Sequence, residues 1–328
     1  MCEITPVVPA VFIGQQLAGR RKMEATGRLQ KLWVSYLRER FTILLAVALI
    51  YFSIPDASYH VDPVSLIIVF LPVLISAELL QRRYNYPLAE TFLILGIPVG
   101  LIFTTIGLLQ IFGNYSNPAA SPTIESVALS TNIMLLTIFY GIIICVTGSM
   151  LKGRHTVRVT CPTISTSSLL LLIGTVATTI VIALELGYGL AGGFSFYPFL
   201  LCSGISALFI YSRESAGGIA TSLSENLADS SLATVIIGIM ISIIRLYASY
   251  GLSSDYQFIE PYLFFETTNY ANYCLFYGST LYTFAFFLSL RTGKIATINF
   301  KARNWHMLEA FSFYVFMTLA APSIFELV

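Results

Sequence analysis

Long apolar segments follow one another along most of this chain, and the gaps between them hold most of its charged residues. A helix needs about 20 consecutive apolar residues to cross the hydrocarbon core of a bilayer. The chain is 56% hydrophobic and 11% charged, whereas a soluble domain has roughly 25% charged residues. The sequence therefore predicts an all-α, polytopic membrane protein.

Proline and glycine residues divide the apolar segments and predict about nine transmembrane helices. The expected ranges are 33–54, 64–80, 88–113, 127–150, 166–187, 196–212, 228–250, 261–290 and 305–327. Lys and Arg mark cytoplasmic loops. With nine helices, 17 of the 18 Lys and Arg residues fall on one side of the membrane. We therefore expect a cytoplasmic N-terminus and a C-terminus on the outside.

Two stretches of the chain resemble each other, which indicates an internal duplication. A Leu-Ala-Glu triplet at 88–90 recurs as Leu-Ala-Asp at 227–229. A Phe-Tyr-Gly triplet at 139–141 recurs at 276–278. Each copy covers four predicted helices and begins on the cytoplasmic side. The two copies are therefore expected to be parallel repeats rather than an inverted pair.

The duplication divides the chain into five expected parts. A cytoplasmic segment (1–32) precedes the first four-helix repeat (33–151). A cytoplasmic linker (152–163) leads to the second, diverged repeat (164–291). The last part (292–328) holds a linker and one extra C-terminal helix that has no counterpart in either repeat.

Small and hydroxyl-bearing residues gather on one face of two neighbouring helices in the first repeat. Residues three, four or seven positions apart share a helix face. The stripes contain Gly96, Gly100, Thr104 and Gly107 on one helix and Thr137 and Gly141 on the next. Small residues let helices approach closely in lipid, which is the packing interpretation. The functional interpretation is that Thr104 and Thr137 face a polar path, where a hydroxyl binds a cation or a water molecule.

This region resembles the MotA/TolQ/ExbB proton-channel family, and most of all the flagellar stator A-subunit. The segments that carry the resemblance are GIPVGLIFTTIGLLQIF and ALSTNIMLLTIFYG. The resemblance implies that Thr104 and Thr137 are ion-path residues. It also implies that Pro98 is a hinge proline and that Tyr140 and Gly141 form the closing pair. The family's large cytoplasmic domain is reduced here to residues 81–87.

The resemblance implies a membrane subunit of a proton- or sodium-driven motor or energy-transducing complex in the bacterial inner membrane. The implied partner is a single-span B-type subunit with an intramembrane carboxylate, within a hetero- or homo-oligomer in the lipid bilayer. Two alternatives stay open. One is a non-conducting scaffold subunit of a membrane assembly, and the other is a small-solute transporter with its site between the repeats.

One charged residue falls inside a predicted helix of the second repeat. Arg245 occupies the position that aligns with Gly107 of the first repeat. A charge inside the membrane costs at least a few kcal/mol and indicates a functional site. The candidate partners at the same depth are Glu185 and Glu266. An unpaired guanidinium would repel cations, so we expect only the first repeat to keep a cation-compatible surface.

The sequence carries no signature of an enzyme, since no P-loop, HExxH or GxSxG motif occurs. The three histidines lie far apart, and none of the five cysteines forms a CxxC pair. Spacing of this kind does not predict a disulfide framework or a zinc site. We therefore expect no enzymatic activity, no cofactor, no metal centre and no nucleic-acid partner.

Overall fold

The part of the chain that the structure describes is helical throughout. The computed structural model describes residues 62–115, 124–152, 163–187, 189–215, 223–252, 261–293 and 298–326. All of these residues belong to one unit, which spans 56–328. Its helices are α3 (Pro63–Tyr84), α4 (Leu88–Tyr115), α5 (Ile124–Lys152), α6 (Thr166–Gly187), α7 (Phe196–Ser215), α8 (Leu223–Leu252), α9 (Pro261–Thr292) and α10 (Phe300–Glu326).

The prediction of an all-helical, multi-pass membrane protein is confirmed for the described residues. Among them, the six helices α3, α4, α5, α6, α8 and α9 are long and apolar enough to cross a membrane. Helix α7 has a shorter apolar stretch, Phe196–Ser212, and α10 is not one of the six. The predicted helix at 33–54, the segment 1–32 and most of the linker 152–163 lie outside the described residues. The count of nine therefore stays a prediction.

Local sequence signals fix the ends of α3. Asp62 is the N-cap, and its carboxylate accepts hydrogen bonds from the backbone N–H groups of Val64 and Ser65. Pro63 follows at the first helical position, where its missing N–H costs nothing. Asn85 ends the helix with φ 52°, and its N–H donates to the carbonyl of Gln81. Asn tolerates this left-handed conformation better than most residues do.

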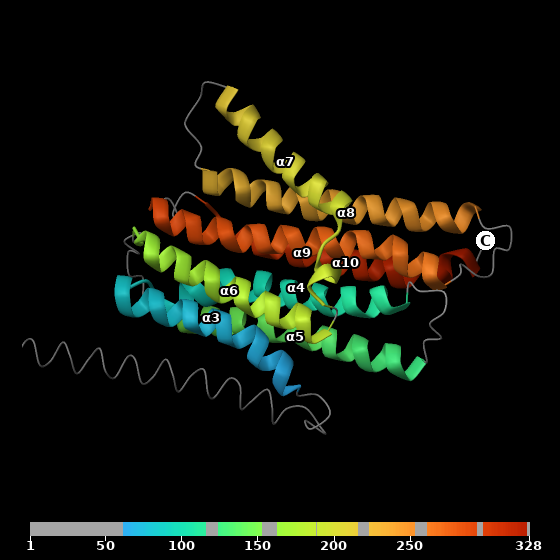
Figure 1. The fold of residues 1–328 in the computed structure, drawn as a ribbon, viewed down its shortest axis with the longest axis horizontal. Helices are drawn as coiled ribbons and strands as arrows, with labels where there is room; N and C mark the ends of the chain where they lie inside the picture. The colour runs from blue at the N-terminus through green and yellow to red at the C-terminus, as the bar shows by residue number, and fades with distance from the viewer. Residues whose placement is uncertain are drawn as a thin grey trace, which may run out of the picture. The chain divides into compact units, whose positions relative to one another are not determined.

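The helices are arranged around a central row in the order α5, α4, α9, α8 (Figure 1). Helix α4 lies inside the row, and nearly all of its side chains are buried. Helix α3 packs on α4 and α5, and α7 packs on α8 and α9. Helix α6 lies against α3, α4 and α9.

Helix α10 lies on the other face of this row from the segment that leads into α7. On α9, Tyr273 donates a hydrogen bond to the carbonyl of Gly192, and Tyr282 donates one to the carbonyl of Phe300. Nine residues separate the two tyrosines, so they project from opposite sides of α9. Helix α10 contacts α8, α4 and α9.

Consecutive helices run in alternating directions (Figure 1). Helices α4 and α8 therefore run one way, and α5 and α9 run the other. The basic side chains gather where α3, α5 and α9 end and where α4 and α10 begin. This basic end holds Arg82, Arg83, Lys152, Arg291, Lys301 and Arg303. Asp62 lies at the opposite end of the bundle, at the start of α3.

Candidate functional site

The two threonines predicted to line an ion path meet at the contact between α4 and α5. The hydroxyl oxygens of Thr104 and Thr137 lie 2.8 Å apart. Thr104 also lies 2.8 Å from the carbonyl oxygen of Gly100, a back-bond of the kind that threonine forms inside helices. Both side chains are buried. Thr104 and Thr137 therefore face each other within the protein rather than the surrounding lipid.

Glycines bring the backbones of α4 and α5 into contact next to the threonine pair. A Cβ atom at Gly141 would lie 2.5 Å from the carbonyl oxygen of Gly96 and 3.0 Å from Cα of Gly100. A Cβ atom at Gly96 would lie 2.7 Å from the carbonyl oxygen of Gly141. These contacts lie between the threonines and the basic end. The two helices therefore leave no space between them on that side of the pair.

The other stripe residues occupy different surroundings. Gly107 lines a cavity instead of a helix contact. Tyr140 is buried, and its ring meets the ring of Phe70 edge-on at 6.4 Å, which joins α5 to α3. Pro98 lies inside α4 and is buried. The structure thus brings most residues of the two stripes together at the α4–α5 contact. Gly107 lies outside this contact, at the cavity.

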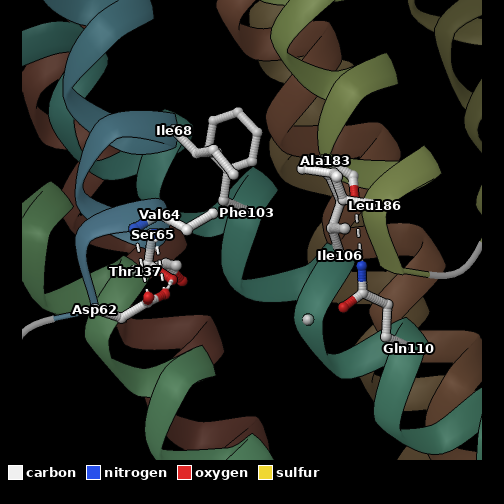
Figure 2. Close-up of a pocket in the computed structure, with 11 residues that line it drawn as sticks. Asp62, Val64, Ser65, Ile68, Phe103, Ile106, Gln110, Thr137, Ala183 and Leu186 are labelled. Carbon is white, nitrogen blue, oxygen red and sulfur yellow. Dashed lines mark hydrogen bonds between the residues drawn. The ribbon is translucent and has the colours of Figure 1, made fainter. Parts of the chain in front are cut away.

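A cavity of about 160 Å³ opens between α3, α4, α5 and α6 beside the threonine pair (Figure 2). Its lining residues are Asp62, Val64, Ser65, Ile68, Phe103, Ile106, Gly107, Gln110, Thr137, Ala183 and Leu186. The polar members come from three separate parts of the chain: the start of α3, α4 and α5. The lining is mostly apolar, but its polar groups and the size of the cavity leave room for a few water molecules. Thr137 belongs both to this cavity and to the pair with Thr104.

A carboxylate lies at this cavity and is held in place by the start of α3. The carboxylate of Asp62 accepts bonds from the backbone N–H of Ser65 at 3.0 Å and of Val64 at 3.3 Å. The hydroxyl of Ser65 donates to the same carboxylate. Across the cavity, Nε2 of Gln110 donates to the carbonyl of Ala183 at 3.3 Å (Figure 2). Carboxylate, hydroxyl and amide oxygens are the ligands that hard cations prefer.

The cavity does not have the donor set of a tight metal site. Within the described residues, no group of three His, Cys, Asp or Glu side chains lies close enough together to hold a metal ion. One carboxylate with several neutral oxygens can instead contact a hydrated cation. The sequence alone did not indicate Asp62 or Gln110 as cavity residues, because their place in the cavity depends on α3 and α6 lying beside α4.

Arg245 pairs with one of its two candidate partners. Nη2 of Arg245 lies 4.0 Å from Oε1 of Glu266, and its guanidinium carbon lies 5.9 Å from the ring centre of Tyr270. The Arg245 side chain is 45% exposed and that of Glu266 is 60% exposed. Glu185 is an exposed residue of α6. The positive charge of Arg245 is therefore balanced at the surface of the α8–α9 pair.

The second helix pair packs in a different register from the first. A Cβ atom at Gly278 would lie 2.9 Å from the carbonyl oxygen of Ser231 and 2.5 Å from Cγ2 of Val235. The alignment that pairs Gly107 with Arg245 also pairs Gly96 with Thr234 and Gly100 with Gly238. It therefore predicts Thr234 and Gly238, rather than Ser231 and Val235, beside Gly278. Helix α8 is thus shifted along α9 by three residues, which is about 4.5 Å at the usual helical rise.

This shift separates the residues that align with the threonine pair. Ser242 aligns with Thr104, and its hydroxyl donates to the carbonyl of Thr267 at 2.7 Å. Cys274 aligns with Thr137 and packs against α8 at a different level. The hydroxyl pair of Thr104 and Thr137 is therefore not reproduced at the aligned positions of α8 and α9.

Charged residues at the basic end form a cluster that sequence reasoning missed. Glu90 is buried, and its two carboxylate oxygens each lie 2.7 Å from an ammonium group, one of Lys152 and one of Lys301. Burial lowers the pKa of Lys301, while the bond to Glu90 opposes this shift. Arg303 binds Asp229 through Nε at 2.9 Å.

The cluster shows what the extra C-terminal helix does in the fold. Glu90 and Asp229 are the acidic residues of the two recurring triplets, and each pairs with a basic residue from the first turn of α10. Nδ2 of Asn304, one residue beyond Arg303, donates to two backbone carbonyls of α4 at 2.8 and 2.9 Å. Helix α10 therefore pairs with the acidic residue of both recurring triplets. The recurrence of an acid in both triplets was the available sequence signal.

No protein-family model matches this chain, and neither a curated protein nor a solved structure was found to match it. The resemblance to the MotA/TolQ/ExbB family rests on the motifs quoted above and stays a prediction. What the chain does must therefore follow from its own residues.

Proposed function

We propose that this protein is a membrane subunit of a proton- or sodium-driven motor or energy-transducing complex, similar to MotA and ExbB. It lies in a bacterial inner membrane with a cytoplasmic N-terminus and an outside C-terminus. In this proposal the basic end faces the cytoplasm, and the cavity with Asp62 opens toward the outside. A single-span partner subunit with an intramembrane carboxylate receives the cation.

The observation that carries this proposal is the cavity that leads from Asp62 to the threonine pair. Asp62 attracts a cation from the outside, and Ser65 and Gln110 replace part of its hydration shell. Thr137 lines the cavity, and the cation moves from its hydroxyl to that of Thr104, its hydrogen-bond partner. A hydroxyl can do this without the cost of a charge buried in the membrane.

A comparison of the two proposed repeats supports different functions for them. Gly107 lines the cavity of the first proposed repeat, whereas the aligned Arg245 lies at the surface and pairs with Glu266. The shift of α8 against α9 also separates the aligned pair Ser242 and Cys274. We infer that the first repeat carries the cation and that the second has become structural.

Cation uptake into proteoliposomes tests the proposal. The full chain is purified from its native membranes in mild detergent together with its copurifying single-span protein, and uptake of ²²Na⁺ and of protons is measured in separate experiments. We expect Asp62→Asn and Thr104→Val to lower uptake of one of the two ions several-fold. Asn caps a helix as well as Asp does, so α3 stays intact.

The matched control for the threonine variant is Thr175→Val. The hydroxyl of Thr175 also bonds to the carbonyl four residues earlier at 2.8 Å, but it lies on α6, away from the cavity lining. Equal uptake by the Thr104, Asp62 and Thr175 variants would refute the cation path.

A second candidate function is a non-conducting scaffold. The close backbone contact at Gly96 and Gly141 favours it, because α4 and α5 leave no gap toward the cytoplasmic end. An intact complex that takes up neither ion, with or without the substitutions, would support the scaffold.

A further inference from the structure

The central row of helices has two ends, and the first end is the outer face of α5. Helix α4 covers one side of α5 through Gly141. On the opposite side, Leu135, Phe139, Val146 and Met150 are all exposed. Their spacing places them on a single face of the helix. Helix α5 therefore ends the row with an apolar face.

The same face of α9 is buried inside the row. The residues that align with the four exposed α5 residues are Asn272, Phe276, Thr283 and Phe287. All four are buried. This face of α9 points away from α8, which packs on the side of Gly278. Because α9 lies between α8 and α4 in the row, the α4 side buries it.

The second end of the row is the outer face of α8. Ser231 and Val235 of α8 contact α9. On the opposite side of α8, the exposed apolar residues are Ile236, Ile237, Met240 and Ile244. Helix α4, which aligns with α8, is buried almost completely because it has a neighbour on both sides. Helix α8 thus lacks, within the described residues, the second row neighbour that α4 has.

We propose that copies of this chain associate side by side in the membrane, with the α8 face of one copy against the α5 face of the next. The inference rests on the proposed duplication, because it repeats the internal α4–α9 contact between molecules. Helices α4 and α8 run in one direction and α5 and α9 in the other (Figure 1). The new contact is therefore antiparallel, as the internal one is, and both copies keep the same orientation in the bilayer.

The contact joins two different faces, so it is a head-to-tail interface. Such an interface continues from copy to copy and closes into a ring if the rotation allows it. In lipid, apolar faces associate through close packing rather than through the hydrophobic effect. The internal α4–α9 contact shows that helices of this sequence pack in that way.

The internal contact also predicts which residues meet. The rings of Phe112 on α4 and Phe264 on α9 lie 6.5 Å apart. Transferred to the aligned positions of α8 and α5, this register places Met240 beside Leu135 and Ile236 beside Phe139, within about one helical turn.

Cysteine cross-linking in native membranes tests the interface. Met240→Cys and Leu135→Cys are introduced separately into two full-length chains with different tags, which are then co-expressed. Cys2 and Cys161 are replaced by serine, and the other three cysteines are kept because they are buried. A short bifunctional maleimide is the probe. The control chain carries Leu208→Cys, another exposed apolar position, which lies on α7.

We expect the mixed pair of Met240→Cys and Leu135→Cys to cross-link several-fold more than the pair of Leu208→Cys and Leu135→Cys. Either variant alone gives no dimer, and a chain that carries both gives a ladder of oligomers. Self-cross-linking of Met240→Cys alone would overturn the proposal in favour of a symmetric dimer.

A mixed pair that cross-links no better than the control would also overturn the proposal, provided that both cysteines react with a monofunctional maleimide. In that case lipid or another protein covers these faces. The readout does not depend on cation uptake. A chain that cross-links but carries no cation would refute the proposed function and leave the interface standing.

Discussion

A single added methyl group at Gly141 tests the α4–α5 contact most directly. In Gly141→Ala, the new Cβ lies 2.5 Å from the carbonyl oxygen of Gly96 and 3.0 Å from Cα of Gly100. Both atoms belong to the backbone and cannot rotate away. The two helices must therefore move apart, and the hydrogen bond between Thr104 and Thr137 stretches with them.

The steric cost of the added methyl group can be separated from the gain in helix propensity that alanine brings. Overpacking of this kind costs about 1–3 kcal/mol. Alanine is also favoured over glycine inside a helix by roughly 0.5–1 kcal/mol. The control is Gly174→Ala on α6, where a Cβ atom meets nothing within 4 Å. Only the propensity gain applies there, so the difference between the two variants is the steric cost.

The assay is thermal unfolding of the full chain in mild detergent, followed by tryptophan fluorescence. A difference of 1–3 kcal/mol corresponds to a melting midpoint about 2–12 °C lower for Gly141→Ala than for Gly174→Ala. Equal midpoints would refute the close approach of α4 and α5. In the double variant Gly96→Ala with Gly141→Ala, we expect less than the sum of the two effects, because residues in contact are not additive. A strictly additive result would mean that the two glycines do not share one contact.

Two further substitutions examine how α10 is attached. Glu90→Gln removes a buried carboxylate that binds two lysines, so it should lower the melting midpoint more than Glu78→Gln, which breaks an exposed pair within one helix. Equal effects would show that the buried cluster contributes no more than a surface pair. Asn304→Leu removes the amide that donates to two α4 carbonyls and should cost about 1–3 kcal/mol in the same melt. Ser312→Leu, at an exposed site on the same helix, should change little, and a matching loss there would point to a general effect on α10.

The sequence alone determined that this is a helical membrane protein and where most of its helices begin and end. The apolar segments are long enough to span a bilayer, and the backbone in lipid must bond to itself. Asp62 with Pro63 and the left-handed Asn85 set the ends of α3 through local hydrogen bonds that need no tertiary contact. The small residues at 96 and 100 on α4 and at 141 on α5 also predicted a close helix contact. The face that small residues occupy on a helix can be found from the sequence of that helix alone.

Only the tertiary structure decided which faces meet. In lipid, a side chain that faces another helix and one that faces acyl chains have the same apolar chemistry, so hydropathy does not separate them. The sequence therefore could not place Asp62 and Gln110 in one cavity with Thr137, or Lys301 on Glu90. It also could not give the register of α8 against α9, because similar small residues recur along α8 and several registers satisfy them. Those pairings depend on how several helices pack together. That arrangement set the position of the candidate cation path and of the ion pairs that attach α10.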